Sequence, residues 1–187
     1  MKTALLTTPA NKKYPQTTVT LTINASITDA FNYLAPINLT RIFPGTGLIA
    51  GIANTTINEG WNKAGLSRTI FFKDGTTSKE TMLTFDGPTS FSYKNEQFSS
   101  KVLGSLMTRL EGEWKFVDLK NGSTKIEWTY RAIPKNYFAK LFVKYVLIKM
   151  IHGMLHKALS IGKADLETGN LPGLDFNNKG AEPSILA

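Results

Sequence analysis

The feature that most constrains the fold is a succession of short alternating strands between residues 61 and 130. Every second position in these strands is mostly large and apolar, and charged side chains interrupt the series at a few places. The positions that alternate in this way are Arg68, Ile70, Phe72, Glu80, Met82, Thr84, Phe91, Tyr93, Trp114, Phe116, Ile126, Trp128 and Tyr130. Alternate residues of a strand share one face of the sheet. A packed core accepts the aromatic side chains but not the charges, so the pattern predicts a sheet that lines a cavity.

Turn sequences divide this region into hairpins. Strand-like runs are separated at Asp74-Gly75, Asp86-Gly87 and Asn121-Gly122. Such dipeptides favour tight turns between antiparallel strands. The sheet is therefore predicted to be mostly an antiparallel meander.

Other elements flank the meander. Residues 17–23 alternate Val, Leu and Ile with Thr, which is typical of a half-buried strand. Asn24 or Ser26 is suited to cap a short helix, and a second short helical piece is predicted from Pro36. After Pro134 the pattern predicts one long helix to about residue 168, which leaves 1–16 and 169–187 as polar, turn-rich tails around a domain at 17–168.

That long helix has two predicted irregularities and an unusual surface. Gly153 and Gly162 are its expected soft points. The helix is apolar around most of its circumference, and one sheet face does not cover all of it. The surplus is expected to line the cavity, with membrane contact or a homodimer as alternatives.

Composition narrows the function classes. The chain has no cysteine, which excludes disulfides and Cys-based catalytic or metal sites. Without a recognisable secretory leader, a cytoplasmic location is expected. The net charge of +8 depends on the lysines of residues 135–163, which alternate with apolar residues and have no acidic neighbour in that segment. Nucleic-acid binding is not expected, because these lysines form no basic stripe with stacking aromatics.

The order of elements resembles the helix-grip fold, an α+β fold. Single motifs strengthen the resemblance: Ala30-Phe31, Trp61 with Gly65, Arg68 before Asp74-Gly75, Glu80, Pro88 with Tyr93, Gly112-x-Trp114, and Trp128-x-Tyr130. Over about residues 17–168 the chain is similar to the polyketide cyclase and lipid-transport branch of the START-like (SRPBCC) superfamily. The resemblance implies a curved antiparallel sheet of about six or seven strands wrapped around the C-terminal helix. It also implies a ligand that is a lipid, a polyketide or a hormone-like molecule, but not one particular activity.

Glu80 and Arg68 are the charged candidates for the cavity. In plant hormone receptors of the superfamily, a Glu that opens the equivalent strand makes polar contacts with the ligand, and Glu80 resembles it. An odd-length loop at Asp74-Gly75 would place Arg68 on the same face as Glu80, and an even one would separate them. Both arrangements stay open at this level, and the alternative for the two residues is an ion pair at the rim of the sheet.

Aromatic candidates complete the predicted site. Tyr93, Trp114, Trp128 and Tyr130 each combine apolar area with one hydrogen-bonding group, which suits a ring-containing or long apolar ligand. Trp61 is expected at the cavity mouth or as an anchor of an edge strand. Ordinary core packing is the alternative for each of these residues.

Binding without turnover is the leading interpretation, and two rivals remain. The first is a polyketide cyclase- or dehydratase-like enzyme, in which Arg68 would act with Tyr93 or Tyr130, or Glu80 as acid or base. Glu113 and Glu127 alternate with the tryptophans, so they are expected to face solvent, and Glu111 shares their parity. The second rival is peripheral lipid transfer by way of the lysine-rich helix.

No metal or cofactor is expected. His152 and His156 have the i, i+4 spacing of two helical metal ligands, but no third ligand is evident. The glycine-rich run 45–51 lacks a following helix, so a turn or lid at the cavity mouth is expected there in place of a nucleotide loop.

Overall fold

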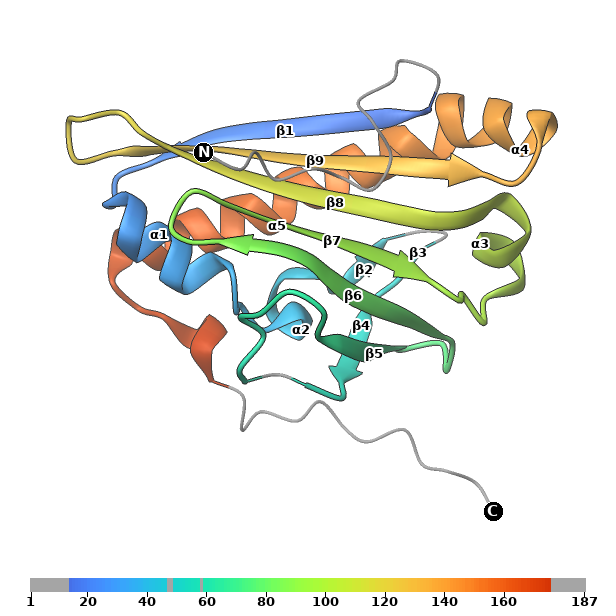
Figure 1. Ribbon diagram of the computed structural model, residues 1–187, viewed down its shortest axis with the longest axis horizontal. Helices are drawn as coiled ribbons and strands as arrows, with labels where there is room; N and C mark the ends of the chain where they lie inside the picture. Colours follow the sequence, from blue (N-terminus) through green and yellow to red (C-terminus); the bar gives the residue numbers. More distant parts are fainter. Residues whose placement is uncertain (1–13, 47–48, 58, 176–187) are drawn as a thin grey trace.

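A seven-stranded antiparallel sheet curves around one long C-terminal helical segment (Figure 1). The computed structural model describes residues 14–46, 49–57 and 59–175, and most of both predicted tails lies outside these ranges. The strands follow the order β1-β9-β8-β7-β6-β5-β4 across the sheet. Their bounds are β1 (Gln16–Ile23), β4 (Ile52–Thr55), β5 (Ser67–Phe72), β6 (Thr77–Asp86), β7 (Ser90–Glu96), β8 (Met107–Asp118) and β9 (Thr124–Pro134). The predicted helix-grip α+β fold is confirmed, with the meander in the expected order.

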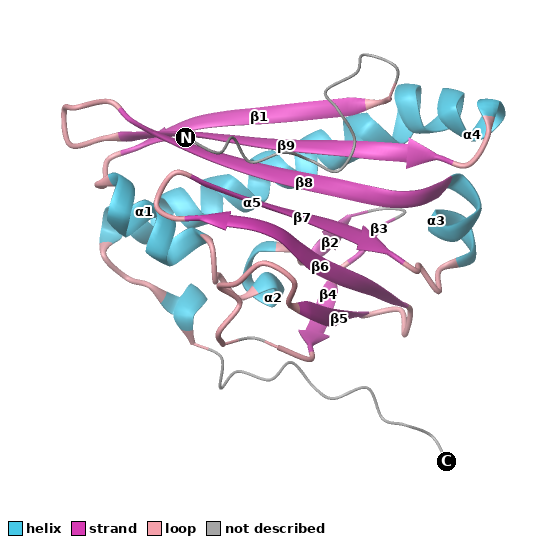
Figure 2. Ribbon diagram, viewed as in Figure 1, coloured by secondary structure: helices cyan, strands magenta, loops and turns pink. Residues whose placement is uncertain are grey.

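Shorter elements close the ends of the sheet (Figure 2). They are α1 (Ile27–Leu34), α2 (Leu39–Ile42), the hairpin β2 (Gly45–Thr46) and β3 (Ile49–Ala50), α3 (Lys101–Leu106) and the 3-10 turn η2 (Pro172–Leu174). Ser26 caps α1, because its hydroxyl accepts a hydrogen bond from the amide of Asp29 at 3.1 Å. The two short helices after the first strand are thus as predicted, whereas α3 is too short for its sequence to show a helical period.

The long C-terminal segment is less regular than its sequence predicts. It consists of α4 (Tyr137–Phe142), a π-helical turn η1 (Val143–Leu147) and α5 (Ile148–Thr168). The predicted soft points at Gly153 and Gly162 are wrong, since both lie inside regular α-helix. Gly162 has a packing role instead, because a Cβ there would lie 2.5 Å from Cδ2 of Leu34 on α1. No helix within the described ranges combines the length and apolar character that a membrane crossing requires.

The β5–β6 turn decides the register that places the charged candidates. The backbone N–H of Phe72 donates a hydrogen bond to Thr76 O at 2.9 Å. This bond leaves a three-residue loop, 73–75, in which Gly75 has φ +79°. A left-handed glycine at the end of a three-residue loop is a common hairpin geometry. Arg68 therefore lies directly across from Glu80, and both point to the concave face of the sheet.

A buried polar cluster fixes the far end of α5. The Tyr33 hydroxyl of α1 donates to Asp165 Oδ2 at 2.7 Å, and Arg41 Nη2 of α2 lies 2.8 Å from Asp165 Oδ1. The Tyr33 oxygen also accepts the amide of Gly173 in η2 at 3.1 Å. Asp165 is 6% exposed, so these bonds replace the water that a carboxylate would otherwise hold. We call this set the Asp165 clamp.

Candidate functional site

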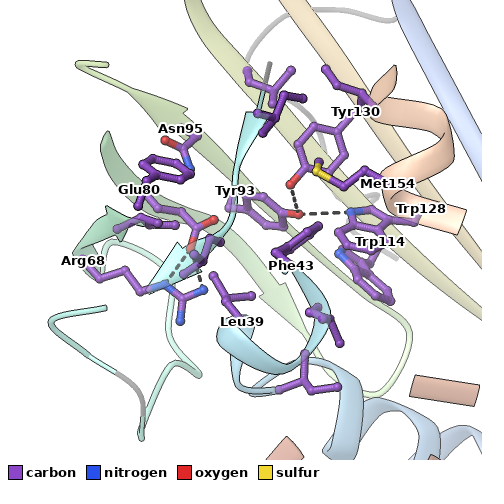
Figure 3. A pocket seen from close by; sticks show the side chains of 18 of the residues that line it. Leu39, Phe43, Arg68, Glu80, Tyr93, Asn95, Trp114, Trp128, Tyr130 and Met154 are labelled. Atoms are coloured by element: carbon purple, nitrogen blue, oxygen red, sulfur yellow. Dashed lines mark hydrogen bonds and ion pairs between the residues drawn. The ribbon is translucent and has the colours of Figure 1, made fainter. Parts of the chain in front are cut away.

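A cavity of about 90 Å³ lies between the concave face of the sheet and the C-terminal helix (Figure 3). Strands β4 to β9 supply one wall, and α1, α2, β3, α3, η1, α5 and the loops between them supply the rest. All seven sequence-predicted site residues line it: Trp61, Arg68, Glu80, Tyr93, Trp114, Trp128 and Tyr130. This space accommodates a compact molecule, or one end of a longer molecule.

One pole of the cavity carries the buried ion pair. Arg68 Nε and Nη2 both lie 2.6 Å from Glu80 Oε2, and the two side chains are 5% and 4% exposed. The guanidinium stacks over the Trp61 ring at 4.2 Å from the centroid. The hydrogen bond from Arg68 goes to Oε2, and Glu80 Oε1 accepts none from the described residues, so this oxygen of the paired carboxylate can accept one from a ligand.

Asn95 is a polar residue of the lining that sequence reasoning missed. It lies directly across from Glu80 in the β6–β7 register, and its buried Oδ1 has no hydrogen-bond partner in the described structure. A buried amide oxygen without a partner costs free energy unless a ligand or water satisfies it. The alternation Phe91, Tyr93, Asn95 was the signal that could have found it.

The centre of the cavity holds a hydrogen-bonded aromatic network (Figure 3). Trp128 donates its indole N–H to the Tyr93 hydroxyl at 3.0 Å, and Tyr93 donates to the Tyr130 hydroxyl at 2.9 Å. The Tyr130 hydroxyl proton, at the end of this chain of bonds, has no acceptor among the described residues. The Trp114 ring packs on Trp128 with 4.0 Å between centroids, which holds the indole in place.

Burial determines the protonation of both tyrosines. Desolvation raises the pKa of Tyr93 well above the ordinary value of 10.0, and Glu80 nearby adds to the shift. Desolvation likewise raises the pKa of Tyr130, with Tyr93 as the next cause. The two phenols therefore stay protonated at neutral pH and serve as hydrogen-bond donors rather than bases.

These shifts predict a loss of stability at alkaline pH. Because the folded-state pKa values are raised, the stabilisation is complete below pH 10.0 and is lost as the pH rises above it. Two such groups can remove up to about 3 kcal/mol of unfolding free energy per pH unit. Urea unfolding at pH 9, 10 and 11 measures this slope, because these values bracket the ordinary tyrosine pKa of 10.0. A Tyr93→Phe/Tyr130→Phe variant should make the slope shallower without abolishing it, because burial and the hydrogen bond to Asp165 also raise the pKa of Tyr33. Tyr137→Phe, at a side chain 68% exposed, should leave the slope unchanged.

The other glutamates lie on the convex face, as their alternation predicts, but they are less exposed than expected. Glu113 is 9% exposed and Glu111 is fully buried. Glu111 Oε1 lies 2.7 Å from Arg109 Nε, and its other oxygen lies 3.6 Å from Arg131 Nη1. Glu127 is partly exposed and pairs with Lys125. None of the three lines the cavity, which leaves Glu80 as its carboxylate.

The two histidines lie on the exposed side of α5. His152 Nδ1 is 2.8 Å from the Thr17 hydroxyl of β1. Among the residues that the structure describes, no group of three or more His, Asp or Glu side chains could hold a metal ion.

Comparison with known proteins identifies the family. The model of the family described as "Polyketide cyclase / dehydrase and lipid transport" matches residues 15–167. The chain belongs to this family. Among curated proteins, no sequence matches this one. Membership of this family supports a ligand-binding fold, with which the internal cavity agrees.

Solved structures share the fold at low sequence identity. The ZhuI aromatase/cyclase from a Streptomyces species is 14% identical with a TM-score of 0.59, over 82% of this chain and 96% of that one. The protein XoxI from Bacillus cereus is 16% identical with a TM-score of 0.58, over 88% and 99%. Ara h 8.0201 is 14% identical with a TM-score of 0.55, over 78% and 96%. At such identities these likenesses establish the architecture alone.

Proposed function

We propose that this protein binds an apolar small molecule with a polar head inside the cavity and releases it unchanged. The observation that carries the proposal is an aromatic-lined cavity in which Asn95 Oδ1, a buried acceptor that no described residue satisfies, lies across from the Glu80 carboxylate. A folded protein leaves few buried polar atoms without partners, and a bound ligand would supply the hydrogen bond that Asn95 lacks.

The chemistry of the lining narrows the ligand class. Two neighbouring acceptors favour a head group with hydroxyl or N–H donors, because each can then accept one hydrogen bond. The Tyr130 hydroxyl would donate to a carbonyl or ether oxygen further along the molecule. Trp114 and Trp128 supply flat apolar surfaces for a ring or a hydrocarbon body. Lipids, polyketide-like compounds and other ring-containing molecules of modest size meet these requirements.

Native mass spectrometry of the purified protein, followed by extraction and small-molecule analysis, tests the proposal. We expect a retained apolar compound that carries at least one donor group. Tyr130→Phe should weaken its binding about threefold to tenfold, since one neutral hydrogen bond is lost. Tyr137→Phe removes an equivalent hydroxyl from an exposed site and is the matched control. If the protein is isolated empty and binds no member of a lipid and polyketide panel, the proposal is wrong.

A second candidate function is cyclase or dehydratase chemistry, which is favoured by the accessible Glu80 Oε1 next to Arg68. In that case the carboxylate would take a proton from a bound polyketide-like substrate, and Arg68 or Tyr130 would stabilise the developing oxyanion. An Arg68→Gln/Glu80→Gln variant removes both charges, and its two amide side chains can still hydrogen-bond to each other. Turnover that disappears in this variant, with binding retained, would establish the enzyme. A retained compound that stays chemically unchanged with the wild-type protein supports simple binding.

Peripheral lipid transfer is a third candidate function, and it requires contact with a membrane in addition to ligand binding. A carrier must exchange its ligand with a bilayer, so movement of a fluorescent lipid between two vesicle populations should depend on protein concentration. This activity needs a surface that contacts membranes.

A further inference from the structure

One end of the molecule exposes an unusual amount of apolar surface. Helices α3 and α4 meet there, next to the π-helical turn η1 (Figure 1). The exposed apolar side chains are Val102, Tyr137, Phe138, Leu141, Phe142, Tyr145 and Val146, with Phe138 at 81% and Tyr137 at 68% exposure. We call these residues the end patch. Large exposed aromatic clusters are unusual on a monomer and mark contact surfaces.

The helical period explains why the end patch faces outward. Ala139, Val143, Leu147 and Ile151 recur every four residues and are buried against the sheet. The residues between them consequently project away from the domain. Since the buried stripe already holds the segment on the sheet, the domain does not require the exposed aromatics for its own packing.

The charges around the end patch are of one sign. Residues 97–110 and 132–164 contain no Asp or Glu. The lysines on the helices and turns of this end are Lys101, Lys135, Lys140, Lys144 and Lys149. None of the five forms an ion pair with a described residue, and Lys144 Nζ lies 5.0 Å from the centre of the Tyr145 ring. Exposed aromatics among unpaired lysines complement a surface that is apolar beneath and anionic at its boundary.

The end patch lies next to one end of the cavity. Leu103 of α3 and Leu147 of η1 both line the cavity, while Val102 and Val146, their neighbours in sequence, belong to the end patch. The same short elements thus have one side in the cavity and the other at the surface. A partner bound to the end patch would therefore contact α3 and η1, the elements that close this part of the cavity.

We propose that the end patch docks on an anionic lipid bilayer, with its aromatics at the headgroup boundary and its lysines against lipid phosphates. Together with the proposed function, on which this part rests, docking would place one end of the cavity beside the source of an apolar ligand. A second copy of the chain is a poorer occupant. A two-fold interface would bring the same unpaired lysines of both copies face to face, with no acidic residue in either segment to compensate.

Vesicle co-sedimentation of the full chain tests the proposal. Wild-type protein should bind phosphatidylcholine vesicles that contain phosphatidylserine, bind pure phosphatidylcholine much less, and dissociate as salt screens the lysines. Lys140→Gln/Lys144→Gln should lower the partition coefficient roughly 25-fold, about fivefold for each lysine. Phe138→Ser/Tyr145→Ser should lower it at least roughly tenfold through lost apolar burial.

Matched variants elsewhere on the surface serve as controls. Val117→Ser/Leu119→Ser removes apolar side chains of 45% and 40% exposure from the β8–β9 turn region. Lys63→Gln/Lys73→Gln removes two exposed lysines outside the end patch. Both control variants should bind vesicles as the wild type does. Equal losses in the control and end-patch variants would overturn the proposal, as would a wild type that ignores phosphatidylserine.

Two further readouts separate the possible failures. If light scattering shows a wild-type dimer that Phe138→Ser/Tyr145→Ser dissociates, and no vesicle binding occurs, the end patch belongs to a second copy and the proposal is wrong. Native mass spectrometry of the end-patch variants should show the same retained compound as the wild type. A protein that carries a ligand but ignores vesicles refutes the docking alone, whereas one that binds vesicles but never a ligand refutes the proposed function.

Discussion

Replacing Glu80 alone with leucine is expected to lower the free energy of unfolding by about 3 to 5 kcal/mol, because it leaves the Arg68 guanidinium buried without its counter-charge. The two side chains are 5% and 4% exposed, so water cannot replace the lost carboxylate without opening the structure. The Arg68→Met/Glu80→Leu variant removes both charges and should recover most of this loss. Urea unfolding of the wild type, both single variants and the double variant measures the coupling between the two residues.

An exposed ion pair provides the control for this cycle. Lys120 Nζ lies 2.8 Å from Asp118 Oδ2, and its side chain is 84% exposed. Lys120→Met should leave the urea midpoint unchanged, because solvent screens such pairs. Strictly additive effects at Arg68 and Glu80 would contradict a buried, coupled pair. A double variant that is stable but no longer retains a ligand would assign the pair to binding.

Gly112→Ala is expected to be the second most damaging change, with a loss of roughly 3 kcal/mol from overpacking and from broken hydrogen bonds of the Tyr93 hydroxyl. Gly112 lies directly across from Tyr93 in the β7–β8 register. A Cβ at this position would lie 2.6 Å from Cε2 and 2.7 Å from the hydroxyl oxygen of Tyr93. The ring would have to move, and the network to Trp128 and Tyr130 would move with it. Thermal unfolding and ligand retention should therefore fall together.

The same substitution at Gly153 is the matched control. This exposed glycine of α5 has no atom within 4 Å of an added Cβ. Gly153→Ala should raise the stability by about 1 kcal/mol, because alanine favours the helix. A Gly112→Ala variant as stable as the wild type would show that Tyr93 has room to move, and the network would then not be rigid.

Strand periodicity made the fold and the seven predicted lining residues accessible from sequence. Alternation assigns each residue to a face, and one register then carries the assignment across the sheet, as Arg68 and Glu80 show. The register itself depended on the left-handed backbone of Gly75, which the sequence permits but does not require. Whether the seven residues contact a ligand stays a prediction.

Other features depended on tertiary contacts that periodicity does not encode. Asn95 looked like an ordinary strand residue, and its unsatisfied oxygen becomes visible only when its neighbours are in place. Glu111 was assigned to the correct face, yet its burial between Arg109 and Arg131 depends on contacts within β8 and across to β9. The π-helical turn at Val143–Leu147 was not predicted, because the irregularities of the helix were expected at Gly153 and Gly162, later in the sequence.

The Asp165 clamp makes the two ends of the cavity mechanically unequal. Near that residue, α5 is also tied to the sheet by Lys163, which donates to Thr22 O at 2.8 Å, and by Glu167, which accepts the Asn24 amide at 2.9 Å. Opening the clamp exposes the buried Asp165 carboxylate, so the amides of this half of the helix should exchange with deuterium last. Motion that admits a ligand would then be concentrated at α3 and α4, while the end of the cavity near the Asp165 clamp stays closed.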